Sequence, residues 1–240
     1  MNKGSIKDYK LYSTALQEEI KMLIYFPASF SPLYKYNLLI AQDGQDYFQL
    51  GRMARIADEL IHNKEMTNTI IIGIPYHDVK DRYEKYHPQG KKNINYIRFL
   101  AHELVPFLDQ EFPTYQMGMG RALIGDSLAA TVSLMAALEY PNTFGKIILQ
   151  SPYVNETIVT KVQQFRHSHL IDVYHVVGLE ETSVETTKNK DEANFLEANR
   201  KLSSLFKEMK FPYFYEEFNG DHTWTYWQPD LNRALSLMLK

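Results

Sequence analysis

The residues with the clearest chemical potential are the five at positions 125–129, Gly-Asp-Ser-Leu-Ala. An apolar run at residues 122–124 precedes them, and an apolar segment follows them. A strand that turned sharply on Gly125 and continued as a helix from Leu128 would expose the Ser127 side chain at the strand's carboxyl end. Small residues flank such a serine because the backbone of the turn is strained and crowded. The pattern predicts a nucleophilic serine, against the alternative that these five residues are an accident of composition.

A serine nucleophile needs a base and a carboxylate that orients the base. The serine hydroxyl is weak until a neighbouring histidine takes its proton, and the carboxylate holds that histidine in the correct tautomer. Of the eight histidines, only His222 follows the last predicted strand. The acid is expected after the strand at residues 173–177, where the sequence offers Glu180 and Glu181. We favour Glu181, with Glu180 as the alternative and Asp221 as a weaker third, since a residue adjacent to His222 rarely reaches its ring correctly.

Acyl transfer also requires N–H donors for the oxyanion that forms at the attacked carbonyl. The backbone N–H of Leu128, which directly follows the serine, would be one donor. A second is expected from the turn at residues 42–46, whose glycine allows an amide to point inward, and we predict the N–H of Gln45. Trp224 is a weaker candidate for lining a substrate pocket because it lies close to His222 in sequence.

Alternating strands and helices are predicted to position these residues. Short apolar runs are typical of buried strands, and apolar residues at helical spacing predict amphipathic helices. The predicted buried strands cover residues 37–41, 70–74, 121–125, 146–150, 172–177 and 213–218. The predicted helices cover residues 50–61, 94–108, 127–139, 155–166, 195–209 and 224–239.

Three further segments complete the predicted order. Residues 9–14 and 18–26 have the pattern of an antiparallel pair at a sheet edge, residues 76–92 are expected to form a polar loop, and Pro106 is expected to kink its helix. Alternation of this kind predicts an α/β fold, with a mostly parallel central sheet and helices on both faces. Residues 1–240 are expected to form a single domain without a large cap, and ligands of such sheets bind at the carboxyl ends of the strands.

Composition narrows the classes of protein. Hydrophobic residues make up 45% and charged residues 23% of the chain, which is typical of a globular protein. The net charge of −3 argues against nucleic acid as a partner, and the lack of cysteine excludes a thiol nucleophile. No segment has the pattern of a secretory signal or a membrane span, so we expect a soluble cytoplasmic protein. His167 and His169 lack a clear third ligand, so neither a metal nor another cofactor is expected, and the oligomeric state stays open.

Several motifs together are similar to one known family. In chain order they are Asp-Gly-Gln-Asp at 43–46, Gly-Ile-Pro at 73–75 with Arg82, the elbow at 121–127, Gly-Leu-Glu-Glu at 178–181 and Gly-Asp-His-Thr-Trp at 220–224. Over roughly residues 18–239 the chain resembles the putative esterase family of α/β-hydrolases. That family includes esterase D, enterochelin esterases, feruloyl and acetyl-xylan esterases, and mycolyltransferases.

The resemblance implies the roles of individual residues. It carries over Ser127 as nucleophile, His222 as base and an acid within 178–181, and it adds Arg82 as a weak candidate for substrate binding. Members usually have Gly-Gly where this chain has alanines at 129–130. The expectation is a serine carboxylic-ester hydrolase that forms an acyl-enzyme on a small or medium ester, such as a siderophore ester, an acetylated sugar or an aryl ester. The alternatives are an acyltransferase with the same triad and a catalytically inactive hydrolase-fold binding protein.

Overall fold

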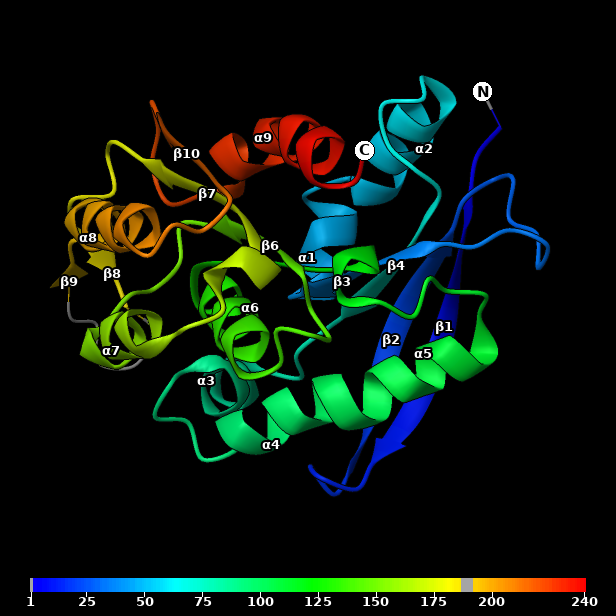
Figure 1. Ribbon diagram of the computed structural model, residues 1–240, viewed down its shortest axis with the longest axis horizontal. Coiled ribbons are helices and arrows are strands. Elements are labelled where there is room, and N and C mark those ends of the chain that lie inside the picture. The colour runs from blue at the N-terminus through cyan, green and yellow to red at the C-terminus, as the bar shows by residue number, and fades with distance from the viewer. Residues whose placement is uncertain (1, 187–191) are drawn as a thin grey trace.

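The computed structural model describes residues 2–186 and 192–240, which build one eight-stranded sheet and a separate two-stranded one (Figure 1). The strands of the large sheet are β1 (Ser5–Ser13), β2 (Glu18–Phe26), β3 (Asn37–Gln42), β4 (Thr69–Ile74), β5 (Arg121–Asp126), β6 (Lys146–Gln150), β7 (Asp172–Gly178) and β10 (Tyr213–Phe218). The small sheet pairs β8 (Val184–Glu185) with β9 (Glu192–Ala193). The spatial order is β1-β2-β4-β3-β5-β6-β7-β10, antiparallel at β1 and β2 and parallel from β4 to β10. The predicted, mostly parallel sheet with an antiparallel edge pair is therefore confirmed.

The central strands send alternate side chains into two separate cores. In β3, Leu38 and Ile40 belong to one hydrophobic cluster, whereas Leu39 and Ala41 belong to the other. Helices α4 to α8 cover the first face, and α1, α2 and α9 cover the second (Figure 1). The helices are α1 (Gly44–Gln49), α2 (Met53–His62), α3 (Val79–Tyr86), α4 (Asn93–Phe99), α5 (Val105–Glu111), α6 (Ser127–Glu139), α7 (Glu156–Gln164), α8 (Phe195–Glu208) and α9 (Trp224–Met238), with short 3-10 turns at Gly118–Gly120 and Ser168–Leu170.

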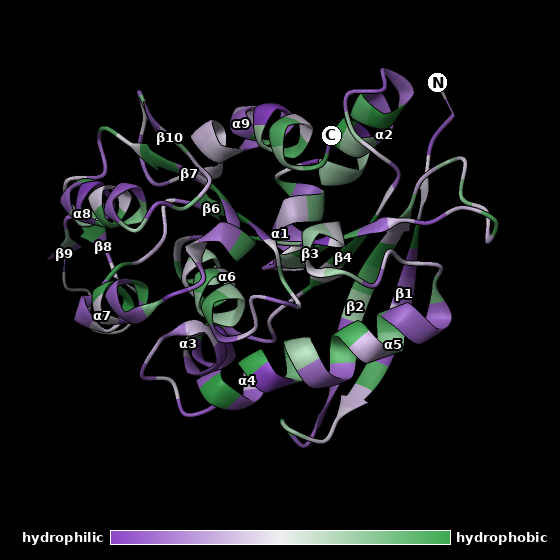
Figure 2. Ribbon diagram, in the orientation of Figure 1, coloured by the Kyte–Doolittle hydropathy of each residue, from purple (hydrophilic) through white to green (hydrophobic). Residues whose placement is uncertain are grey.

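Hydropathy follows this layering. Strands such as β2 are largely hydrophobic, whereas covering helices such as α2 and α8 mix hydrophobic and hydrophilic turns (Figure 2). Helices of this kind bury one face against the sheet and leave the other to solvent. Within the described ranges, 2–186 and 192–240, no helix has both the length and the hydrophobicity needed to cross a membrane.

Two predicted helices differ from the observed ones: one begins later than predicted, and the other is interrupted. The helix predicted from residue 50 begins only at Met53, because α1 ends at Gln49 and Arg52 takes a left-handed φ of 52°. A Cβ on Gly51 would lie 2.5 Å from the Tyr47 carbonyl oxygen, so the chain turns there on a glycine. The helix predicted over 94–108 contains a π-helical stretch, Leu100–Leu104, before Pro106. A widened turn of this kind accommodates a proline, which lacks the N–H that an α-helix requires.

The prediction of a polar loop over residues 76–92 is wrong, because this segment contains α3. The helix begins at an N-cap, Asp78, whose side chain accepts a hydrogen bond from the Asp81 N–H at 2.8 Å. An N-cap of this kind satisfies one of the amides that a helix start leaves unpaired. Helix α3 is rich in charge, so local capping and contacts with the rest of the fold stabilise it more than an apolar stripe does.

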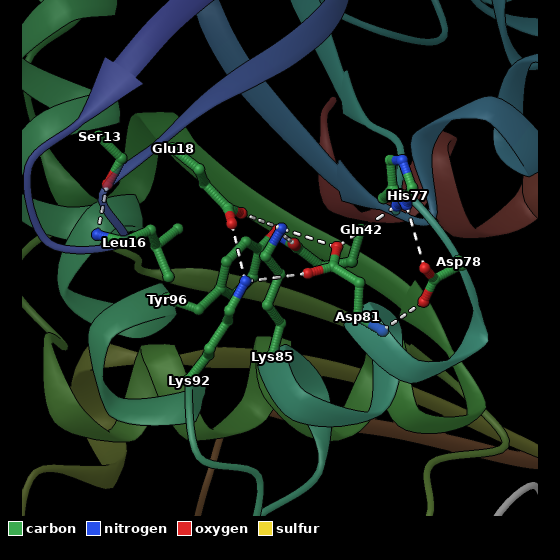
Figure 3. Close-up of polar contacts among 10 residues, drawn as sticks. All are labelled: Ser13, Leu16, Glu18, Gln42, His77, Asp78, Asp81, Lys85, Lys92 and Tyr96. Carbon is green, nitrogen blue, oxygen red and sulfur yellow. Dashed lines mark hydrogen bonds and ion pairs between the residues drawn. The ribbon is translucent and has the colours of Figure 1, made fainter.

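Ion pairs tie α3 to the β1–β2 hairpin (Figure 3). The Lys85 ammonium lies 2.5 Å from Glu18 and 2.8 Å from Asp81, and its side chain is only 8% exposed. Lys92 lies 2.7 Å from the other oxygen of Glu18. Glu18 is the first residue of β2, so the hairpin holds the helix in place from a distant part of the sequence. Charge pairs that are shielded from water in this way are screened less by salt than exposed ones.

Candidate active site

The predicted elbow is present between β5 and α6. The chain reaches Ser127 at the end of β5 and turns there with a left-handed φ of 50°, which is strained for a residue with a side chain. A Cβ on Gly125 would lie 2.2 Å from the carbonyl carbon of Ala129, so the strand and the helix approach as closely as two backbones allow. The geometry explains the residue types: glycine where the backbones meet, and serine at the tip.

The alanine at position 129 is compatible with this turn. Ala129 is fully buried in the core, and the tight contact involves its backbone rather than its methyl group. We expect Ala129→Gly to lower the free energy of unfolding by about 1 kcal/mol, the usual cost of glycine in a helix. Gly125→Ala should cost more than about 3 kcal/mol, because it overpacks a site with no space. Urea denaturation of both variants tests this order, and equal losses would contradict it.

A histidine and a carboxylate meet at the carboxyl edge of the same sheet. His222 Nδ1 lies 2.7 Å from Glu181 Oε2, and Glu181 is fully buried in the turn after β7. The other oxygen, Oε1, accepts the Gly178 N–H at 2.8 Å and the Ser151 hydroxyl at 2.6 Å. Glu180 is exposed to solvent. Of the two candidate acids, Glu181 is therefore the one that contacts the histidine.

Ser127 and His222 line one cavity of about 530 Å³, which opens at the carboxyl edge of the strands. Four aromatic side chains, here called the aromatic wall, form one side of it: Tyr83, His87, Tyr153 and Phe195. Their rings follow one another at centroid distances of 4.4, 5.3 and 6.0 Å, and Phe195 lies 4.5 Å from the His222 ring. The cavity thus joins a hydroxyl, an imidazole and a planar apolar surface.

The two predicted oxyanion donors lie at the starts of helices. Leu128 is in the first turn of α6 and lines the cavity of Ser127, whereas Gln45 is in the first turn of α1 and lines a neighbouring cavity of about 720 Å³. Amides in a first helical turn have no partner within the helix and can bind an anion. Strands β3 and β5, which precede these helices, are adjacent and parallel. The role of the Gln45 amide stays a prediction.

Arg82 belongs to a buried charge cluster beside the elbow. Its guanidinium contacts Asp43 Oδ2 through Nε at 2.7 Å and through Nη2 at 2.6 Å, and it also borders the cavity of Ser127. Asp126 is buried in the same cluster, and its Oδ1 has no hydrogen-bond partner among the residues that the structure describes. Burial, together with the charge of Asp43, raises the pKa of Asp126 to about 8. A neutral carboxyl therefore precedes Ser127 at neutral pH.

This raised pKa makes folding stability depend on pH. The folded protein keeps a proton on Asp126 up to about pH 8, whereas the unfolded chain releases it near 3.8, so rising pH between these values favours unfolding. We expect Asp126→Asn to gain stability over wild type across that range, by at most about 1.4 kcal/mol per pH unit, and to gain no more above it. Chemical denaturation at several pH values measures the difference, with exposed Asp8→Asn as the control. A difference that does not change with pH would contradict the buried neutral acid.

One predicted substrate-binding residue lies outside the cavity of Ser127, and some residues that line this cavity were not predicted. Trp224 packs on Tyr47 at 4.8 Å and on Trp227 at 5.8 Å, and it is not among the residues that line the cavity of Ser127. His87 falls in the segment predicted as a polar loop, but its ring belongs to the aromatic wall. Within the described part of the chain, no group of three or more His, Asp or Glu side chains is arranged to hold a metal ion.

Comparisons with known proteins identify the fold and the family. The fold matches solved α/β-hydrolase structures, among them a ferulic acid esterase with a TM-score of 0.79, 15% identity and coverage of 100% of this chain and 98% of that one. Another is the enterobactin esterase Fes from Shigella flexneri, with a TM-score of 0.84 and 16% identity. That match covers 99% of this chain and 59% of the Shigella protein. The fold is thus that of an α/β-hydrolase.

The sequence identifies the family within that fold. Residues 13–238 match the family described as "Putative esterase", and the chain belongs to it. A relative in Bacillus subtilis (strain 168), the "Uncharacterized protein YjcH", is 52% identical over 236 residues, which are 98% of each chain. As a member of this family, the protein is a carboxylic-ester hydrolase.

Proposed function

We propose that Ser127, His222 and Glu181 form the catalytic triad of this esterase. The observation that carries the proposal is that His222 bonds to buried Glu181 through Nδ1 and shares a cavity with Ser127. A carboxylate on Nδ1 holds a proton there, which leaves Nε2 as the basic nitrogen. The left-handed backbone of Ser127 and its place at the end of β5 support its role as the nucleophile.

The reaction then proceeds through an acyl-enzyme. His222 takes the Ser127 proton as the oxygen attacks the ester carbonyl, and the amides of Leu128 and Gln45 stabilise the resulting oxyanion. His222 returns the proton to the departing alcohol, leaving an ester on Ser127. Water, deprotonated by the same histidine, releases the acid and restores the enzyme. The proposal also includes a single domain over residues 1–240, a cytoplasmic location and a small-molecule substrate.

Among the candidate esters, the aromatic wall favours one that carries an aryl group. Flat rings gain about 0.5–1.5 kcal/mol from stacked or edge contacts beyond their burial. Tyr153 lies in the middle of the wall, between His87 and Phe195, and borders the cavity. We expect kcat/KM to be higher for an aryl-acyl ester than for an alkyl-acyl ester of similar size with the same alcohol. Tyr153→Leu should reduce that preference by up to about tenfold.

Three measurements test the proposal. A fluorophosphonate probe should label wild type at Ser127, as peptide mass spectrometry can locate, and His222→Ala should slow the labelling strongly. Labelling of another residue, or none, would overturn the triad, and no labelling would favour the inactive binding protein.

A panel of methyl esters with benzoyl, cinnamoyl, acetyl and hexanoyl groups tests the substrate class. Formation of a new ester when an alcohol acceptor is added would instead identify an acyltransferase.

A further inference from the structure

A second serine, Ser151, lies behind the proposed acid. It directly follows β6, is fully buried, and takes a left-handed φ of 49°. Its N–H donates to the Val176 carbonyl of β7 at 2.8 Å, so the backbone is anchored to the neighbouring strand. A left-handed conformation is uncommon for a residue with a side chain, and it persists where surrounding contacts hold it. The strained turn fixes the position of the Ser151 side chain.

The Ser151 hydroxyl bridges two groups of the site. Its oxygen lies 2.6 Å from Glu181 Oε1 and 3.1 Å from the indole Nε1 of Trp227. The indole N–H can only donate, so it takes a lone pair of Ser151 Oγ. A carboxylate can only accept, so the hydroxyl proton of Ser151 lies on the side of Glu181. The direction of both hydrogen bonds is therefore determined by the chemistry of the two groups.

Together with a ring contact, these hydrogen bonds form a closed loop of neighbouring side chains that includes His222. Trp227 packs edge-on against the His222 ring at a centroid distance of 4.8 Å and an interplanar angle of 83°. Trp227 donates to Ser151, Ser151 donates to Glu181, and Glu181 accepts from His222. With Ser151 and the Gly178 N–H on Oε1, the Oε2 atom of Glu181 is directed to the imidazole. Rotation of the carboxylate would break two hydrogen bonds at once.

We propose that Ser151 is a positioning residue that orients Glu181 toward His222. It is not among the residues that line the cavity of Ser127, and it acts by holding the Glu181 carboxylate in one rotamer. The inference rests on the proposed triad. The competing interpretation is structural: the hydroxyl would serve only to satisfy the buried indole N–H of Trp227, since an unpaired buried donor is costly.

The first test compares two variants of Ser151. Both Ser151→Ala and Ser151→Gly remove the hydroxyl, but glycine also relieves the left-handed strain, so the two should differ in stability. We expect kcat to fall by about 10- to 100-fold in both, the range for losing a hydrogen bond to a charged group, while KM stays within about twofold. The control is Ser133→Ala, which removes another buried serine whose hydroxyl bonds within α6 to the Ala129 carbonyl at 2.8 Å. Activity that follows stability across the three variants would overturn the proposal.

The second test separates the two interpretations. In Trp227→Phe the hydroxyl no longer has an indole to satisfy, so adding Ser151→Ala should be harmless if the role is structural. We expect the added substitution to lower kcat again by about tenfold or more. We also expect the downfield proton NMR signal of His222 Nδ1–H to shift upfield in Ser151→Ala. An unchanged kcat in the Trp227→Phe background, or an unmoved signal, contradicts the proposal.

Failure of this inference can be told apart from failure of the triad. If Ser127→Ala and Glu181→Gln lose activity and Ser151→Ala does not, the triad stands and only the role of Ser151 is wrong. If Ser127→Ala keeps wild-type activity, the triad itself is wrong, and the role assigned to Ser151 falls with it.

Discussion

Replacing Ser127 with alanine should lower kcat on 4-nitrophenyl acetate by about 10⁴-fold or more, because it removes the hydroxyl that forms the proposed acyl-enzyme. The KM should change little, since the cavity and its aromatic wall are intact. Residual turnover above the uncatalysed rate is expected, because oxyanion donors and binding still act on a water attack. Steady-state rates with a buffer blank measure the effect.

The matched control for Ser127 is Ser204→Ala on α8. Ser204 is exposed, and its hydroxyl bonds to the Arg200 carbonyl of its own helix at 3.0 Å. This variant should keep the wild-type rate. Wild-type activity in Ser127→Ala would remove the nucleophile from the proposal and leave the family assignment untouched.

Replacing Glu181 with glutamine should lower kcat by about 10³- to 10⁴-fold, and the hydrogen bonds explain why so small a change is so harmful. Three donors converge on this carboxylate: Ser151 and the Gly178 amide on Oε1, and His222 on Oε2. A glutamine amide has one oxygen, so its NH₂ must face one of the two sides. If the oxygen keeps the two donors, the NH₂ faces Nδ1 and selects the tautomer whose Nε2 carries the proton. That imidazole cannot act as the base.

Glu180→Gln is the control for Glu181→Gln, since it makes the same chemical change one residue earlier on an exposed side chain. Its kcat should stay within about twofold of wild type. Circular dichroism and urea denaturation of both variants establish that they are folded at the assay temperature. Equal losses in the two variants, or a large loss in Glu180→Gln alone, would assign the acid differently.

The sheet and the elbow could be predicted because their determinants are local. Continuous apolar runs occur where a strand is buried on both faces, and Gly125 and Ser127 are adjacent in sequence to the turn that they form. The loop after β7 could be predicted to carry the acid. Glu181 could be favoured over Glu180, but the contact that brings it to His222 could not be derived, because it depends on long-range packing: a Cβ on Gly178 would lie 2.3 Å from the Gly220 carbonyl oxygen.

Helix α3 and Ser151 show why the remaining parts of the site could not be predicted from the sequence. The sequence of α3 lacks an apolar stripe, and its stability comes from the Asp78 cap and from ion pairs with Glu18, which is 60 or more positions away. The left-handed backbone of Ser151 has no signature in its residue type, since serine usually avoids that conformation. With α3 missed, the contributions of Tyr83 and His87 to the cavity were missed too.

The link between Glu18 and Lys85 has a consequence for how this enzyme can diversify. The proposed triad depends on β5, β7 and the segment after β10, whereas α3, which carries part of the aromatic wall, is fastened to the hairpin at the opposite end of the sheet. Part of the aromatic wall and the proposed triad are thus supported by different regions of the chain. We expect substitutions in the hairpin to change which esters fit without altering the proposed triad.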